Sequence, residues 1–175
     1  MSGHDRTLAA IVAGVVVLVV VALVAVRARP EPTYRDEDTP EAVAHDYLLA
    51  MEREEWSRAY GYLSPSLRCY PESAEMFADD VTREPWLRDF DNVELRVTDA
   101  KIEGDVALVT VRQTRFWTGG LFQSGQDTSE FEMKLQREAD GWKIVRSDGF
   151  WWWMWHDESN QPCRTGRSAK PVVAP

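Results

Sequence analysis

The segment from Leu8 to Val26 contains only Leu, Ala, Ile, Val and Gly. A helix of this length measures roughly 28 Å, which is close to the ~30 Å hydrocarbon core of a bilayer. The apolar core of a cleaved signal peptide is shorter, at about 7–15 residues. The run therefore predicts a transmembrane signal-anchor over residues 8–26, behind a short N-terminal tail at residues 1–7. Cleavage after Ala28 is the alternative that the sequence leaves open.

The residues on either side of this run decide little about its orientation. Arg6 precedes it and Arg27 and Arg29 follow it, so the basic residues that the positive-inside rule counts are nearly balanced. The tail before the run is only a few residues long, and residues 27–38 form a polar, Pro-containing linker. This order is typical of an anchor that displays a domain outside. We therefore expect a single-pass protein of the cell membrane with an extracytoplasmic globular domain.

The rest of the chain is acidic. Once residues 1–29 are set aside, 17 basic and 28 acidic residues remain, for a net charge of −11. Such a balance repels phosphate backbones and anionic headgroups, so nucleic acid is not an expected partner. The two cysteines and three scattered histidines form no metal-ligand cluster, and we expect neither a metal nor another cofactor.

Helical periodicity begins at Thr39. The sequence Thr39-Pro40-Glu41 is a typical helix start, because Thr caps, Pro suits the first helical position and Glu complements the dipole. Apolar residues then recur at intervals of three and four, as on one face of a helix. Two further helical segments are predicted, from Trp56 to Leu63 and over residues 73–90, the latter with Trp86 buried. The stripe of the first helix consists of Val43, Tyr47, Ala50 and Met51.

After Asp91 the apolar residues recur with a period of two, which predicts strands. The first strand changes parity near Asp99, which indicates a β-bulge or bend at that point. A loop is predicted at residues 119–127 and a hairpin turn at residues 139–141. The further predicted strands lie at residues 106–117, 130–136 and 142–146.

This order of elements predicts an α+β domain over residues 39–156. Two or three helices would pack on a curved four-stranded antiparallel sheet, behind the N-terminal transmembrane helix. Residues 157–175 are polar and contain Pro, which predicts a flexible C-terminal tail.

Several stretches of the domain resemble the nuclear-transport-factor-2-like (NTF2-like, cystatin-like cone) superfamily. The resemblance covers about residues 39–155 and rests on pattern, without a diagnostic catalytic motif. It implies a curved sheet wrapped around a long helix, leaving a cone whose mouth binds a small molecule, lines an active site or is plugged by side chains. The matching stretches are Thr39 to Val43, Tyr47-Leu48, Trp56 to Tyr60, Leu63 to Pro65, the Phe131-x-Met133-x-Leu135 strand and Asp140 to Ile144.

The inward stripes give the candidates for the wall of such a cone. Enzymes of the superfamily use pocket Asp, Tyr and His residues for proton transfer, but none of those residues maps onto this chain, so no catalytic residue is assigned. Asp99 is the one acid whose position hints at strain, and a structural role is the simpler interpretation. The pocket-lining candidates are Tyr47, Met51, Trp56, Tyr60, Phe77, Trp117, Phe131, Met133 and Trp142.

An aromatic run closes the domain, from Phe150 to His156. On a strand, Trp151, Trp153 and Trp155 would share one face, and the opposite face would be apolar as well. One set can fill the cone. The other needs a cover, which the chain's own helices or tail, the headgroup layer or a protein partner could supply. The three tryptophans are therefore interface candidates.

The two cysteines permit one intramolecular pairing, between Cys69 and Cys163. A disulfide is expected if the domain lies outside the cytoplasm, and two unpaired thiols if it lies inside.

Two functions follow from these observations. The first is a non-enzymatic, membrane-anchored, envelope-facing domain that serves protein interaction or assembly, with a protein partner or a second copy of the chain. The alternative is a small-molecule binder or a lyase- or isomerase-type enzyme that uses the cone pocket. An open apolar cavity would favour the alternative, and a cone filled with side chains would favour the first.

Overall fold

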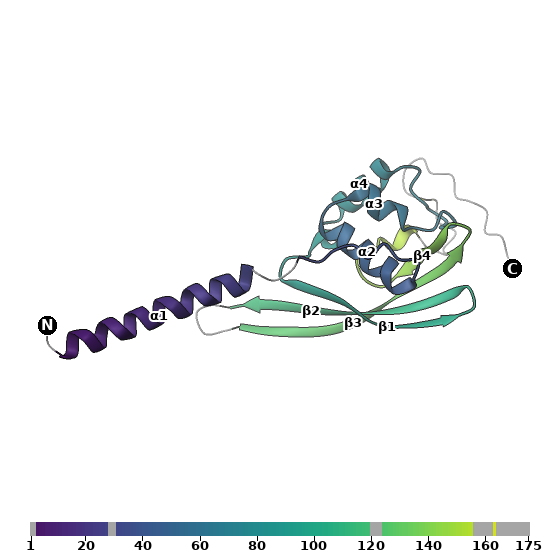
Figure 1. The fold of residues 1–175 in the computed structure, drawn as a ribbon. Helices are drawn as coiled ribbons and strands as arrows, with labels where there is room; N and C mark the ends of the chain where they lie inside the picture. Colours follow the sequence, from purple (N-terminus) through teal and green to yellow (C-terminus); the bar gives the residue numbers. More distant parts are fainter. Residues whose placement is uncertain (1–2, 28–30, 120–123, 156–162, 164–175) are drawn as a thin grey trace. The chain divides into compact units, whose positions relative to one another are not determined.

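A computed structural model describes residues 3–27, 31–119, 124–155 and 163 (Figure 1). The chain forms two compact units, Met1–Thr33 and Tyr34–Pro175. Helix α1 (Gly3–Arg27) makes up most of the first unit. In the described part of the chain, no helix has both the length and the apolar character needed to cross a membrane. The anchor expected over residues 8–26 is therefore not confirmed and stays a prediction.

The second unit begins with helices α2 (Pro40–Glu52), α3 (Trp56–Gly61) and α4 (Ala74–Arg83). The cap of α2 is the expected one, because the Thr39 hydroxyl accepts a hydrogen bond from the backbone N–H of Ala42 at 3.2 Å.

The helical segment predicted over residues 73–90 is interrupted. Helix α4 ends at Arg83, and a 3₁₀ turn, η1 (Pro85–Arg88), follows it. Pro85 explains the break, because the residue before a proline is disfavoured in the helical conformation, and Glu84 is extended. As a result Trp86 lies on the surface with 48% of its area exposed, and its predicted burial is wrong.

The sheet is a meander of four antiparallel strands in the order β1-β2-β3-β4, as predicted. Helices α2, α3 and α4 lie on one face of it (Figure 1), and this α+β arrangement fits the cone. The strands are β1 (Val93–Glu103), β2 (Val106–Thr118), β3 (Ser124–Glu138) and β4 (Gly141–Ser147).

The predicted bulge in β1 is confirmed. Val97 pairs with Val111 and Asp99 pairs with the next residue, Thr110, so Thr98 has no partner of its own in the ladder. The extra residue moves Ala100 onto the helix-facing side, where Val97 already lies.

Strand β3 begins earlier than predicted. The sequence places a loop at residues 119–127, but β3 pairs with β2 from Ser124 onward, and of this loop residues 120–123 lie outside the described residues. The stretch from Ser124 to Ser129 carries polar residues and Gly on both faces, so it shows no alternation that a sequence pattern could detect.

The aromatic run after β4 is not a strand, and that prediction is wrong. Phe150 adopts a positive φ of 51°, and a 3₁₀ turn, η2 (Trp153–Trp155), follows. The chain therefore turns away from the sheet direction and packs into the core. Trp155 is fully buried and stacks on Phe77 with 5.1 Å between ring centroids, and its indole N–H donates to Asp80 at 3.2 Å.

A disulfide joins Cys69, which follows α3, to Cys163, with 5.6 Å between their Cα atoms. Both cysteines are buried. The backbone N–H of Cys69 also donates to the carbonyl of Trp155 at 3.3 Å, so the aromatic segment and the disulfide hold the same part of the helical layer.

Two tryptophans of the same turn give a matched test of this packing. We expect Trp155→Ala to lower the free energy of unfolding by about 3–5 kcal/mol, because it removes a large buried ring and leaves a cavity. Trp153 is 52% exposed, and Trp153→Ala should change the free energy by less than about 0.5 kcal/mol. Denaturant unfolding of both variants measures the difference, and equal effects would contradict the burial of Trp155.

Candidate functional site

Most of the predicted pocket residues lie inside a filled core. Tyr47, Met51, Phe77, Met133 and Trp142 are buried in one cluster, together with residues of the C-terminal aromatic segment. Partly buried side chains pack against the same cluster, and among them are the candidates Trp56, Tyr60 and Phe131. These candidates therefore pack as a core, and one of them, Trp142, also lines the cavity described below.

Trp117 differs from the other pocket candidates. It is 54% exposed and does not belong to the buried cluster, so its expected place in a pocket wall is wrong. It lies near the end of β2, beyond the last residue of that strand that pairs with β1.

The interface candidates also divide into buried and exposed residues. Trp151 and Trp155 are buried, so they are not available to a partner in this structure, whereas Trp153 is exposed. The turn at η2 causes this, because on a 3₁₀ segment alternate residues no longer share one face.

Tyr47 is the candidate whose hydroxyl lies deepest. It donates to the carbonyl oxygen of Phe150 at 2.9 Å, and burial strongly raises the pKa of its phenol. A neutral hydroxyl engaged by the backbone serves packing better than proton transfer. Asp99, the acid at the bulge, is exposed on the sheet.

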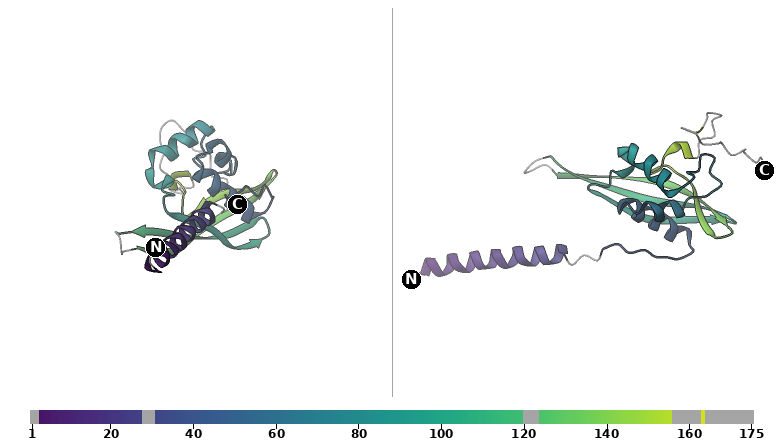
Figure 2. Two further views of the ribbon diagram at one scale, coloured as in Figure 1. Left: turned by 60° about the vertical axis from the view of Figure 1, so that its left-hand side comes forward. Right: turned by 90° about the horizontal axis from the view of Figure 1, so that it is seen from above.

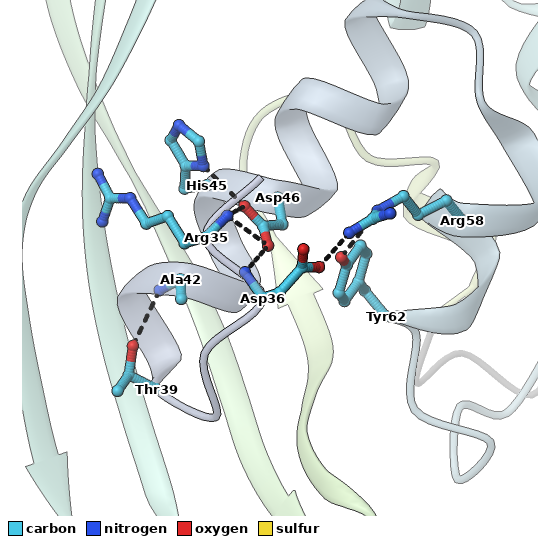
Figure 3. A network of polar contacts seen from close by, with 8 residues as sticks. All are labelled: Arg35, Asp36, Thr39, Ala42, His45, Asp46, Arg58 and Tyr62. Atoms are coloured by element: carbon cyan, nitrogen blue, oxygen red, sulfur yellow. Dashed lines mark hydrogen bonds and ion pairs between the residues drawn. The ribbon is translucent and has the colours of Figure 1, made fainter. Parts of the chain in front are cut away.

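The most elaborate polar site surrounds Asp46, a residue that the sequence analysis does not single out. Its side chain is 2% exposed and accepts hydrogen bonds from the backbone N–H groups of Arg35 and Asp36, each at 3.0 Å, and from Nδ1 of His45 at 2.8 Å (Figure 3). Burial alone raises the pKa of this carboxyl, but the N–H of Arg35, the His45 ring and the N–H of Asp36 outweigh it and lower the pKa below its usual value.

Asp46 could have been found from the periodicity. It lies three residues after Val43 and four before Ala50, so it belongs to the same buried stripe of α2. An acid on an apolar stripe requires hydrogen-bond donors, and here the preceding chain supplies them.

The donors come from Tyr34–Asp38, which we call the latch segment. Asp36 forms an ion pair with Arg58 of α3, and the Arg58 guanidinium lies 3.5 Å from the centroid of the Tyr34 ring. At the other end, Asp38 accepts a hydrogen bond from the backbone N–H of Trp142 at 3.2 Å. The linker predicted over residues 27–38 is therefore wrong in its second half, because residues 34–38 are bound to the domain.

A cavity of about 280 Å³ lies beside the latch segment. Acidic residues dominate its wall, with Lys143 as the one basic residue that lines it among the described residues. Its size and charge suit a small polar or cationic group. The lining residues include Asp36, Glu37, Asp38, Asp46, Tyr62, Asp140, Trp142 and Lys143.

The end of the β2–β3 hairpin is the second feature that stands apart from the core. Its last pairs, from Phe116 with Gln126 to Thr118 with Ser124, lie beyond the last pairing of β1, which joins Val93 to Arg115. We call Phe116–Thr118 and Ser124–Gln126 the hairpin arm. The arm carries two exposed aromatic side chains at neighbouring positions, Phe116 and Trp117.

Comparisons with known proteins find similar solved structures at low sequence identity. No family model matches it, and no curated protein matches its sequence. Similar solved structures include a SEC-C motif containing protein from Rhodopseudomonas palustris, with 18% identity over 64% of this chain and 79% of that one and a TM-score of 0.44.

Two further similar structures are NTF2-like. One is a protein of unknown function from Shewanella oneidensis, with 13% identity over 60% of this chain and 90% of that one and a TM-score of 0.40. The other is a protein with a cystatin-like fold from Novosphingobium aromaticivorans, with 14% identity over 61% of this chain and 75% of that one and a TM-score of 0.40. The similarity concerns the fold and assigns no function.

The Asp46 site makes stability depend on pH. We expect Asp46→Asn to lower the free energy of unfolding at pH 7 by about 1–3 kcal/mol, because the charged acceptor of three N–H groups is lost. The carboxyl has a lower pKa in the folded state than in the unfolded state. Its contribution is therefore complete above the unfolded pKa of about 3.9 and is lost as the pH falls through the folded pKa.

The difference between wild type and Asp46→Asn should accordingly shrink at acidic pH, as denaturant unfolding at a series of pH values would show. Asp79→Asn is the control, because this carboxylate is exposed and should contribute less than about 0.5 kcal/mol. A difference that stays constant from neutral to acidic pH would contradict the role assigned to the Asp46 charge.

Proposed function

We propose that this chain is a single-pass, membrane-anchored protein whose domain faces the extracytoplasmic side and serves protein interaction or assembly without catalysis. The observation that carries the proposal is the filled interior. Tyr47, Phe77 and Trp155 are fully buried in one hydrophobic cluster, whereas an enzyme that used the interior of the cone would need an open pocket there. The function would then depend on the surface of the domain and on its attachment to the membrane.

The apolar run from Leu8 to Val26 supports the anchor, because its length and composition suit the hydrocarbon core of a bilayer. The disulfide between Cys69 and Cys163 supports a position of the domain on the extracytoplasmic side of the membrane. Disulfides persist in extracytoplasmic compartments, whereas the thiol pools of the cytosol keep cysteines reduced.

The free face of the sheet supports the interaction role. Helices α2, α3 and α4 cover one face (Figure 1), and no other described helix or strand of the second unit, Tyr34–Pro175, covers the opposite face. This face carries exposed paired charges such as Arg112 and Glu130, with 2.9 Å between their charged atoms, and exposed apolar side chains such as Leu108. A mixed polar surface with an apolar contact point is typical of an interface that is not permanent.

The alternative, a small-molecule binder or lyase-type enzyme, would depend on the acidic cavity beside the latch segment. That cavity borders the core at Trp142, and its buried carboxylate, Asp46, already accepts three hydrogen bonds. A general base needs a free lone pair directed at the substrate, so Asp46 is poorly suited to the task.

The disulfide gives a test of localisation. When cells that produce the full chain are denatured, a thiol-reactive polyethylene glycol maleimide should label Cys69 and Cys163 only after reduction. Before denaturation, the protein should stay with the membranes after an alkaline wash. Cys69→Ser is the matched control, because it leaves Cys163 free and should be labelled without reduction. Labelling of unreduced wild type, or release by the wash, would contradict the proposed localisation.

The interaction role is tested by a photo-crosslinking residue at Leu108 in intact membranes. We expect it to form a defined product, either with one membrane-associated protein or with a second copy of the chain, which mass spectrometry would identify. Thr82 provides the control position, because it is exposed on α4 on the opposite side of the domain. Equal product patterns from both positions, or no product from Leu108, would contradict an interface on the free face.

A further inference from the structure

We infer that the hairpin arm is a membrane-surface contact, in which Phe116 and Trp117 enter the headgroup layer of the bilayer. The inference rests on the proposed function, because it needs the chain to be anchored through residues 8–26. Its evidence comes from the arm and from the path of the latch segment.

The arm exposes aromatic side chains on both of its faces. Phe116 and Trp117 are neighbours on one strand, so their side chains point to opposite sides of the ribbon, and they are 42% and 54% exposed. A flat protein partner would cover one face and leave the other ring in water. A headgroup layer surrounds an inserted ribbon on all sides, and it is the environment in which Trp is enriched.

The arm is also free of charge. The sequence from Phe116 to Gln126 contains no Asp, Glu, Lys, Arg or His, although charged residues make up 28% of the chain. An uncharged tip avoids the cost of moving ions into the interfacial region. The first charged residues on the way back to the domain are Arg115 and Asp127, which are paired opposite each other.

Trp117 is held flat on the arm. A Cβ atom at Gly125 would lie 2.3 Å from Cζ2 of the Trp117 ring, so the absence of a side chain there lets the indole rest against β3. The arm therefore presents a fixed aromatic surface, and less conformational entropy is lost when that surface is buried.

The latch segment begins at the end of the domain that carries the arm. The Tyr34 ring lies 5.3 Å from the guanidinium of Arg53, at the C-terminal end of α2. The next residue, Glu54, pairs with Arg88 at 3.6 Å, and Asp89 pairs with Arg115 at 2.7 Å. Arg115 directly precedes the arm, and Figure 2 shows the β2–β3 hairpin extending beyond the other strands.

The opposite end of the latch segment, Asp38, is bound at the start of β4, near the turn that follows β3. The segment thus runs along the domain and presents Tyr34 at the end where the arm emerges. Residues 28–33 separate the end of α1 from Tyr34 and reach at most roughly 25 Å when extended. If residues 8–26 span the bilayer, this tether keeps the arm-bearing end of the domain close to the membrane surface.

The experiment uses the full chain, with a site-specific protease sequence placed between Arg27 and Tyr34, in vesicles of phosphatidylcholine and phosphatidylglycerol. After cleavage, flotation separates vesicle-bound domain from free domain. We expect the wild-type domain to remain with the vesicles, and Phe116→Ser with Trp117→Ser to lower the bound-to-free ratio by about tenfold or more. Trp153→Ser removes an equally exposed tryptophan elsewhere and should leave the ratio unchanged.

Three results would overturn the inference: release of the wild-type domain on cleavage, equal retention of wild type and the double variant, or retention that disappears when protein is diluted at constant lipid. The last would identify a second copy of the chain as the occupant. Trp117→Tyr keeps an interfacial aromatic and should retain most of the binding, which separates loss of the contact from loss of folding. If the uncleaved chain does not insert into the vesicles, the result contradicts the proposed anchor and not the membrane contact of the hairpin arm.

Discussion

The stack of Trp155 on Phe77 is the contact on which the rest of the domain depends. It draws the C-terminal segment back over the helices, and the Asp80 carboxylate accepts the indole N–H so that burial leaves no polar group unsatisfied. When Trp155 is buried there, the carbonyl oxygen of Phe150 accepts a hydrogen bond from the Tyr47 hydroxyl, and Cys163 forms a disulfide with Cys69. A sheet and helices that could enclose a pocket instead enclose side chains of the segment from Phe150 to Trp155.

At the start of the domain, the latch segment supplies hydrogen bonds to a buried carboxylate in a similar way. Asp46 is buried on the inner stripe of α2, and its cost is offset by consecutive backbone N–H groups that would otherwise face solvent. The arrangement couples the first residues of the domain to its core.

Local chemistry accounts for what the sequence could predict. The Thr39 cap, the four antiparallel strands and the bulge beside Asp99 all follow from nearest-neighbour patterns, and each is present in the structure. The failures concern long-range contacts. The segment from Trp151 to Trp155 fits the periodicity of a strand. It turns inward because Phe77 and Asp80, which are distant in the sequence, offer Trp155 a stacking partner and a hydrogen-bond acceptor. The binding of Arg35 and Asp36 to Asp46 likewise joins groups about ten residues apart, beyond the reach of periodicity alone.

Net charge places a limit on how such a domain can approach a bilayer. The acidic domain is repelled by anionic headgroups, but at physiological salt the repulsion decays over about 8 Å. From Arg115 to Thr118 the arm advances by roughly 10 Å, at about 3.4 Å per residue. A neutral ribbon of this length allows its aromatic rings to reach the headgroups while the acidic body stays about one screening length away. In the proposed contact, the absence of charge from Phe116 to Gln126 lets the arm approach the headgroups, and the excess of acid elsewhere keeps the body of the domain away from them.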